Sequence, residues 1–274
     1  MPYRHAHWFV GFVLLVIMTG FWASYFSTVG NVPLAFHVHA VSAMTWLALL
    51  IAQHMTIHRR ANGLHRRMGL ASFALFPFLI LGFMMIINVS AARYAAPDAG
   101  EGIRVLGPAF GIGMAIAIAA YLTLFFLALK HRRNVQLHAG YMLATPLILF
   151  ESPFSRVLGD YMPWMNVINS DGPRWVLDTI LISDGLGVVF ALVLWARNRK
   201  HGAPWLVAAG FMALQAVAMW FAPDIPAIAL AFAAYAAVPP GMGLALGLLA
   251  GGAAAWFGWE AGKTPARPRA AAGA

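Results

Sequence analysis

The sequence predicts an all-α integral membrane protein, a helical bundle of about 8 transmembrane helices. Of its 274 residues, 61% are hydrophobic and only 10% are charged. The mean hydropathy of +0.74 is well above that of soluble domains. Apolar runs of about 19–25 residues, enough to cross the hydrocarbon core of a bilayer, recur along the chain. Basic residues gather on alternate connections between these runs, as they do in multi-pass membrane proteins.

The apolar runs place the expected spans as follows. They cover residues 8–26, 34–57, 68–92, 105–129, 138–158, 174–196, 204–222 and 241–259. The first run is longer than the apolar part of a signal peptide, so we interpret it as an uncleaved span. Residues 227–237 are apolar but too short to cross, which predicts an interfacial or re-entrant helix and leaves seven spans as the alternative count.

The charge distribution predicts the orientation of the chain. With the N-terminus inside, 14 Lys and Arg residues fall on inner segments and 4 on outer ones, namely Arg93, Arg104, Arg156 and Arg174. This bias predicts that both termini lie in the cytoplasm, and we expect the protein to reside in a bacterial inner membrane. We expect one transmembrane domain over residues 1–262 and a disordered basic tail over 263–274, rich in Pro, Ala and Arg. The net charge of +9 reflects these inner loops rather than nucleic-acid binding.

A basic, histidine-bearing turn occurs twice. The segment HRRANGLH at residues 58–65 returns 73 positions later as HRRNVQLH at residues 131–138. Each copy lies between two apolar runs, so the repeating unit is a hairpin, about 34–92 in the first copy and 105–158 in the second. The copies have the same orientation, which predicts a parallel repeat with a pseudo-two-fold axis along the membrane normal. The arginines are expected to cap helix ends and bind lipid phosphates.

The turns bring histidines to one side of the membrane. Five are candidate cofactor ligands near the cytoplasmic boundary: His54, His58, His65, His131 and His138. Helix N-termini favour neutral imidazole, the form that ligates metals. Because the chain has no cysteine, histidine is its natural ligand for a b-type haem or a metal ion. We expect His138 to be one ligand, with His54 or His65 opposite it.

A second group of candidates lies nearer the outer side. His37 and His39 begin the second span, and Glu151 lies at a similar depth on the fifth. Neighbours two apart on a helix point in different directions, so either His37 or His39 could form a metal site, a proton relay or a structural hydrogen bond with Glu151. Asp178 and Asp184 lie on the sixth span, and carboxylates in hydrocarbon must face the bundle and pair. Glu151, Asp178 and Asp184 therefore also mark a proton or ion path.

Parts of residues 34–158 resemble a family of uncharacterised bacterial multi-pass membrane proteins. The resemblance rests on FHVH at 36–39, QH at 53–54, HRRMG at 65–69, HRR at 131–133 and YML at 141–143. It implies topology rather than activity. A looser likeness to multi-span b-type cytochromes implies haem held between histidines of neighbouring helices. This chain departs from the two-haem versions, because Glu151 stands where a second histidine of the fifth span would be.

Three functions from different classes remain open on these residues. The leading hypothesis is a redox or electron-transfer protein with one b-type haem or metal, whose partner is a membrane redox protein or a quinone. The second is a transporter or lipid-handling protein that uses Glu151, Asp178 and Asp184. The third is an assembly factor or scaffold for a membrane complex.

Overall fold

The computed structural model describes residues 3–263, which form nine α-helices and no strand. These are α1 (Ala6–Gly20), α2 (Leu34–His58), α3 (Asn62–Ala95), α4 (Glu101–Lys130), α5 (Val135–Tyr161), α6 (Arg174–Arg197), α7 (Ala203–Phe221), α8 (Pro226–Ala236) and α9 (Pro240–Ala261). Short 3₁₀ segments at Phe26–Asn31, Pro163–Met165, Arg199–His201 and Ala222–Asp224 lie in the connections. The all-α fold is therefore confirmed. The predicted disordered tail lies, from residue 264 onward, outside the described residues.

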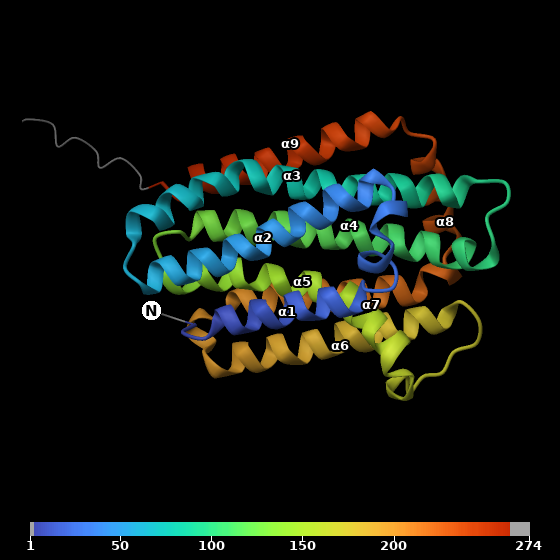
Figure 1. Ribbon diagram of the computed structural model, residues 1–274, viewed down its shortest axis with the longest axis horizontal. Helices are drawn as coiled ribbons and strands as arrows, with labels where there is room; N and C mark the ends of the chain where they lie inside the picture. Colours follow the sequence, from blue (N-terminus) through green and yellow to red (C-terminus); the bar gives the residue numbers. More distant parts are fainter. Residues whose placement is uncertain (1–2, 264–274) are drawn as a thin grey trace, which may run out of the picture.

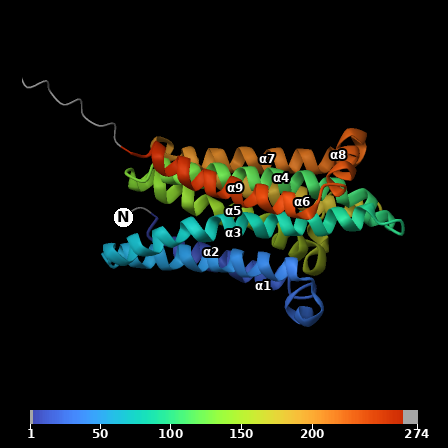
Figure 2. The ribbon, with the colours of Figure 1, turned by 90° about the horizontal axis from the view of Figure 1, so that it is seen from above.

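The long helices run side by side in one bundle (Figures 1 and 2). The α2–α3 and α4–α5 turns, which carry the two copies of the basic repeat, lie at the same end of this bundle (Figure 1). We call this the basic end, and the other the opposite end. Most predicted spans agree with a helix to within a few residues, whereas α1 ends at Gly20 rather than near residue 26.

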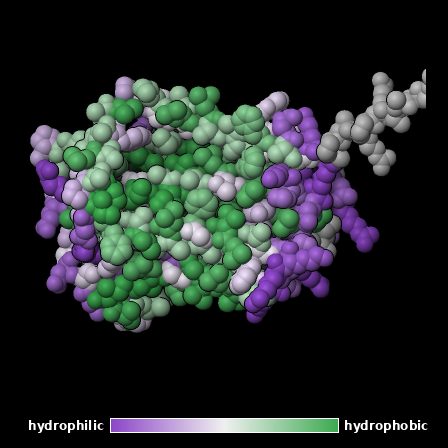
Figure 3. Space-filling view, turned by 180° about the vertical axis from the view of Figure 1, so that it is seen from behind, coloured by the Kyte–Doolittle hydropathy of each residue, from purple (hydrophilic) through white to green (hydrophobic). Residues whose placement is uncertain are grey.

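Six helices are long and apolar enough to cross a membrane: α2, α3, α4, α6, α7 with its 3₁₀ extension, and α9. The helix α1 is shorter, with 15 residues, and α5 is long enough but carries Glu151, Arg156 and Asp160. A multi-pass helical bundle is thus supported, and the count of eight spans is not confirmed. Figure 3 shows apolar side chains in a broad band between two more polar ends, as expected for a bilayer-embedded bundle.

Helices α4 and α5 lie at the centre and contact most of the others. Large aromatic side chains fill the core between α2, α3 and α4. Phe76 and Phe125 stack with ring centroids 4.0 Å apart, and the Trp46 ring lies 5.5 Å from each. Glycines allow the closest helix contacts: a Cβ on Gly251 of α9 would lie 2.6 Å from the Cα of Pro77 on α3. Such small-residue contacts are typical of membrane helix packing.

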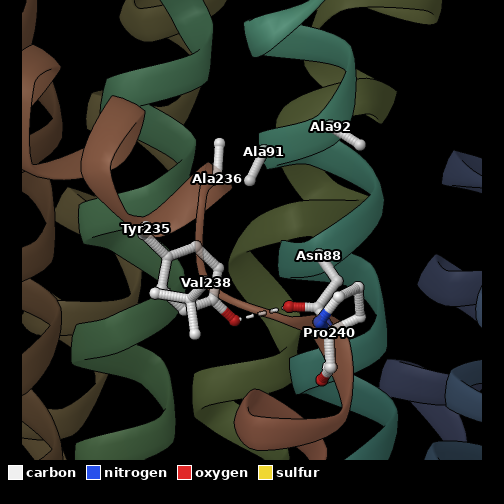
Figure 4. Close-up of a pocket in the computed structure, with 7 residues that line it drawn as sticks. All are labelled: Asn88, Ala91, Ala92, Tyr235, Ala236, Val238 and Pro240. Carbon is white, nitrogen blue, oxygen red and sulfur yellow. Dashed lines mark hydrogen bonds between the residues drawn. The ribbon is translucent and has the colours of Figure 1, made fainter.

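The short helix α8 lies at the opposite end, in agreement with the predicted non-spanning segment at 227–237. Two hydrogen bonds of Asn88 on α3 join this region to the bundle. The Tyr235 hydroxyl of α8 donates to Asn88 Oδ1 (2.6 Å), and Asn88 Nδ2 donates to the carbonyl of Pro240 at the start of α9 (3.2 Å). A cavity of about 50 Å³ adjoins these residues (Figure 4). It has room for water but not for an organic substrate.

Candidate functional site

A buried carboxyl group on α5 forms the centre of the most polar region inside the bundle. Glu151 is 7% exposed, and Gln215 Nε2 on α7 donates a hydrogen bond of 3.1 Å to its Oε2. The Ser183 hydroxyl on α6 donates to the main-chain carbonyl of Glu151, also at 3.1 Å. Polar side chains of α6 and α7 therefore converge on Glu151 of α5.

Asp184 on α6 is a second carboxyl group in this region. It is completely buried, and neither of its carboxylate oxygens has a hydrogen-bond partner among the described residues. It lies within electrostatic reach of Glu151. Burying an unpaired carboxylate in an apolar interior is costly, so the site favours binding of a proton or a cation.

One arginine lies near this carboxyl pair. Arg156, one to two turns beyond Glu151 on α5, is within electrostatic reach of it. Its Nη1 donates to the carbonyl (2.7 Å) and hydroxyl (2.8 Å) of Ser152, and its guanidinium lies 4.6 Å from the Phe21 ring centroid. Arg156 and Glu151 form no ion pair within 4 Å in the described structure. One positive charge for two carboxyl groups means that a single bound proton brings these three groups to neutrality.

Two prolines flank Glu151 on α5. Proline has no amide hydrogen, so Pro146 and Pro153 each leave the carbonyl four residues earlier without its helical donor. Thr145 Oγ1 compensates at the first proline by donating to the Met142 carbonyl (2.8 Å). Glu151 therefore lies on a helical segment with fewer internal hydrogen bonds than a regular helix has.

Asp178, the third predicted path residue, has a different environment. Its Oδ2 accepts hydrogen bonds from Asn166 Nδ2 (3.0 Å) and from the Ser170 amide (2.8 Å). Both partners belong to the connection between α5 and α6. Asp178 thus fixes this connection to α6, and only its Oδ1 is buried without a partner within residues 3–263.

The predicted inner histidines separate into distinct groups at the basic end. The His54 ring packs at a tilt against the rings of His58 (centroids 4.1 Å apart) and of His7 on α1 (5.0 Å). The Nε2 of His54 is 3.0 Å from the Tyr3 carbonyl, and the Nδ1 of His58 is 2.8 Å from the His54 carbonyl. Carbonyls only accept hydrogen bonds, so these nitrogens are the protonated ones.

His65 and His138 lie near each other in a second group. The Nδ1 of His138 donates to the Ala128 carbonyl (2.8 Å), which leaves its Nε2 with a lone pair. His131 stacks on the Tyr141 ring, with centroids 5.7 Å apart. Partial burial lowers the pKa of the His131 imidazole, and the adjacent Lys130 ammonium lowers it further.

The outer histidines are not brought to Glu151. The Nδ1 of His37 is 3.0 Å from the Tyr25 hydroxyl, and His39 packs against the Phe83 ring of α3 at 4.6 Å between centroids. Within the part of the chain that the structure describes, no three His, Cys, Asp or Glu side chains are arranged to hold a metal ion. A metal site that includes His37, His39 and Glu151 is therefore not supported.

The sequence analysis missed the partners of these residues. Gln215 and Ser183 have no sequence signal of their own, because polar uncharged residues are common in membrane helices. The contact between His7 and His54 is not predicted by the sequence analysis, which treats His7 only as a residue before the first apolar run. The available signal is depth, because the start of the first span and the end of the second span lie on the same side of the membrane.

No protein-family model, curated protein or solved structure matches this chain. The family resemblance noted above therefore has no support from these comparisons, and function must be argued from the site.

Proposed function

We propose that this protein is a proton-coupled membrane transporter that binds and releases a proton at Glu151 and Asp184. The observation that carries the proposal is the environment of Asp184: a fully buried carboxyl group, both oxygens unpartnered among the described residues, beside Glu151. Buried carboxyl groups inside membrane bundles mark proton relays and ion paths. Together with Arg156, the pair changes between neutral and singly negative when it exchanges one proton.

The local structure of α5 supports the same proposal. Transporters commonly hold their coupling ions at interrupted helices near the middle of the bilayer. Glu151 lies between Pro146 and Pro153, and about 15 Å from the nearer end of its helix at 1.5 Å per residue. α5 is continuous, but its two prolines weaken the helical hydrogen bonding at the depth where the buried carboxyl pair lies.

Infrared difference spectroscopy of the reconstituted protein tests the proton-binding step directly. We expect a pH-dependent carboxyl C=O band that disappears in Glu151→Gln and in Asp184→Asn. Asp98→Asn is the matched control, because Asp98 is exposed in the α3–α4 connection and its removal should leave the buried band unchanged. A spectrum whose pH-dependent bands are unaffected by both buried variants would refute the proposal.

Transport is measured separately in proteoliposomes that contain a pH-sensitive dye. Under an imposed membrane potential, wild type should accelerate proton entry over empty liposomes, and Glu151→Gln should reduce it to the empty-liposome rate. If no flux occurs although the infrared band is present, candidate solutes are added to the same vesicles. Flux that Glu151→Gln leaves unchanged would contradict the role of this residue.

A b-type haem on His138 is the second candidate, and a specific observation favours it. Metal-ligating histidines usually donate their other ring N–H to a carbonyl or carboxylate, as His138 does to Ala128. His65 is the nearby second histidine, whereas His54 packs with His7 and His58. An absorption spectrum of protein from haem-replete cells tests this candidate. A Soret band that His138→Ala alters and His201→Ala leaves intact supports it, and no Soret band overturns it.

A further inference from the structure

The two copies of the basic turn use their arginines differently. In the second copy, Arg132 Nη1 donates to the Trp259 carbonyl (2.7 Å) and to the Leu129 carbonyl (3.1 Å), and its guanidinium lies 4.0 Å from the Trp259 ring centroid. Asn134 caps α5 by accepting a hydrogen bond from the Leu137 amide (3.2 Å). The second turn is therefore occupied largely by contacts within the protein.

The first copy has none of these contacts. Ala61 stands where the second copy has Asn134, and no side chain caps the start of α3. Four exposed arginines surround this helix start, and none of their side chains forms a hydrogen bond or ion pair with any residue between 3 and 263: Arg59, Arg60, Arg66 and Arg67. We call these four residues the first-turn patch.

The chain offers this patch no negative charge nearby in sequence. Residues 1–97, which include α1, α2 and α3, contain no Asp or Glu, and the first acidic residue of the protein is Asp98. Asp98 belongs to the α3–α4 connection, which lies at the opposite end of the bundle (Figure 1). The counter-charge for four guanidinium groups must therefore come from outside this part of the chain.

The surroundings of the patch fit a lipid rather than a soluble partner. It lies at the junction of α2 and α3, two helices long and apolar enough to cross a membrane, and therefore at the level of the lipid headgroups. Leu64, on the first turn of α3, is 51% exposed and Leu70 is 56% exposed. Apolar side chains beside arginines match an amphiphile with an anionic head and acyl chains.

We propose that the first-turn patch binds the phosphate headgroup of an anionic phospholipid, while the second basic turn mainly joins helices. Guanidinium groups bind phosphate oxygens through paired hydrogen bonds, and free amides at the start of α3 add donors of the same kind. This proposal is independent of the transport function and of any haem.

Thermal stability of the full-length protein in nanodiscs tests it. Nanodiscs of phosphatidylcholine are supplemented with increasing phosphatidylglycerol, and the concentration for half-maximal stabilisation is measured. Each arginine near an anionic surface contributes about five-fold in affinity, so Arg66→Gln with Arg67→Gln should raise this concentration about 25-fold. Lys130→Gln with Arg133→Gln removes the same charge from exposed positions of the second turn and should change it less than five-fold.

Three results would overturn the proposal. Equal losses in the two double variants would mean that only diffuse charge acts, and no loss in the first would mean that the patch binds no lipid. Stabilisation by inorganic phosphate equal to that by phosphatidylglycerol would mean that the ligand is a free anion. If Arg66→Gln with Arg67→Gln fails to fold, Arg59→Gln with Arg60→Gln, which lie outside α3, removes the same charge from the turn.

Discussion

The Thr145 hydroxyl joins α2 to α5 and also offsets a hydrogen bond that Pro146 removes. Trp46 Nε1 donates to Thr145 Oγ1 (2.9 Å), and Thr145 Oγ1 donates to the Met142 carbonyl (2.8 Å). Both Trp46 and Thr145 are completely buried. Thr145→Val keeps the shape of the side chain, so its effect reports these two hydrogen bonds rather than a cavity.

The expected loss of stability follows from these contacts. A side-chain hydrogen bond between membrane helices contributes about 0.6 kcal/mol on average. Leaving a buried donor unsatisfied, as the variant leaves the Trp46 indole N–H, costs about 1–3 kcal/mol. We therefore expect Thr145→Val to lower the free energy of unfolding by about 1–3 kcal/mol. Thr145→Ser retains the hydroxyl and should recover most of the loss.

The measurement is equilibrium unfolding by SDS in mixed micelles, followed by tryptophan fluorescence. Thr19→Val is the matched control, because Thr19 is exposed and its hydroxyl donates only to the Leu15 carbonyl of its own helix. This control should stay within about 0.5 kcal/mol of wild type. If Thr145→Val and Thr19→Val have the same stability, the reasoning about the Thr145 hydroxyl is wrong.

Three further predictions concern packing, charge and protonation. Gly251→Ala forces α9 from α3 and should cost about 1–3 kcal/mol, whereas Gly252→Ala, which has open space, should not destabilise by SDS unfolding. Arg132→Gln should cost about 1–3 kcal/mol because α9 loses a charged donor, and the exposed Arg133→Gln should be near neutral in the same assay. The pKa of the His131 imidazole, followed by NMR, should lie below the ordinary value of 6.5. The folded protein then favours the neutral ring, so this contribution to stability is present above pH 6.5 and is lost as the pH falls through the lowered pKa. A titration midpoint at or above 6.5 would contradict this prediction.

The helical spans could be predicted from the sequence because each depends on a local property. The length of an apolar run against the thickness of a bilayer sets where a helix can cross, and α2, α6 and α9 begin within a residue of the predicted positions. Turn formers around Pro239 separated the short α8 from α9 in the same way. The sequence also predicted that the two basic turns lie at one end of the bundle, because two membrane crossings separate them, and the structure places both turns there (Figure 1).

The environment of each polar side chain needed the tertiary structure. Depth along the membrane placed Glu151 level with His39, but depth alone does not give the rotation of a helix about its axis. That rotation turns Glu151 toward Gln215 on α7, and it packs His39 against Phe83 on α3. It likewise packs His54 against His7 and His58, whereas His138 has His65 nearby.

The sequence by itself determined that the chain is a multi-pass helical membrane protein, because hydropathy and segment length act residue by residue. It also singled out Glu151 and Asp184, since carboxyl groups in apolar helices are rare and costly. The tertiary structure decided that these two lie near each other, that Asp178 instead holds the α5–α6 connection, and that Arg132 caps α9 while its counterpart Arg59 stays exposed. Helix rotation and the choice of neighbouring helix are set by packing over the whole bundle, so two turns that share the same HRR segment acquire different contacts.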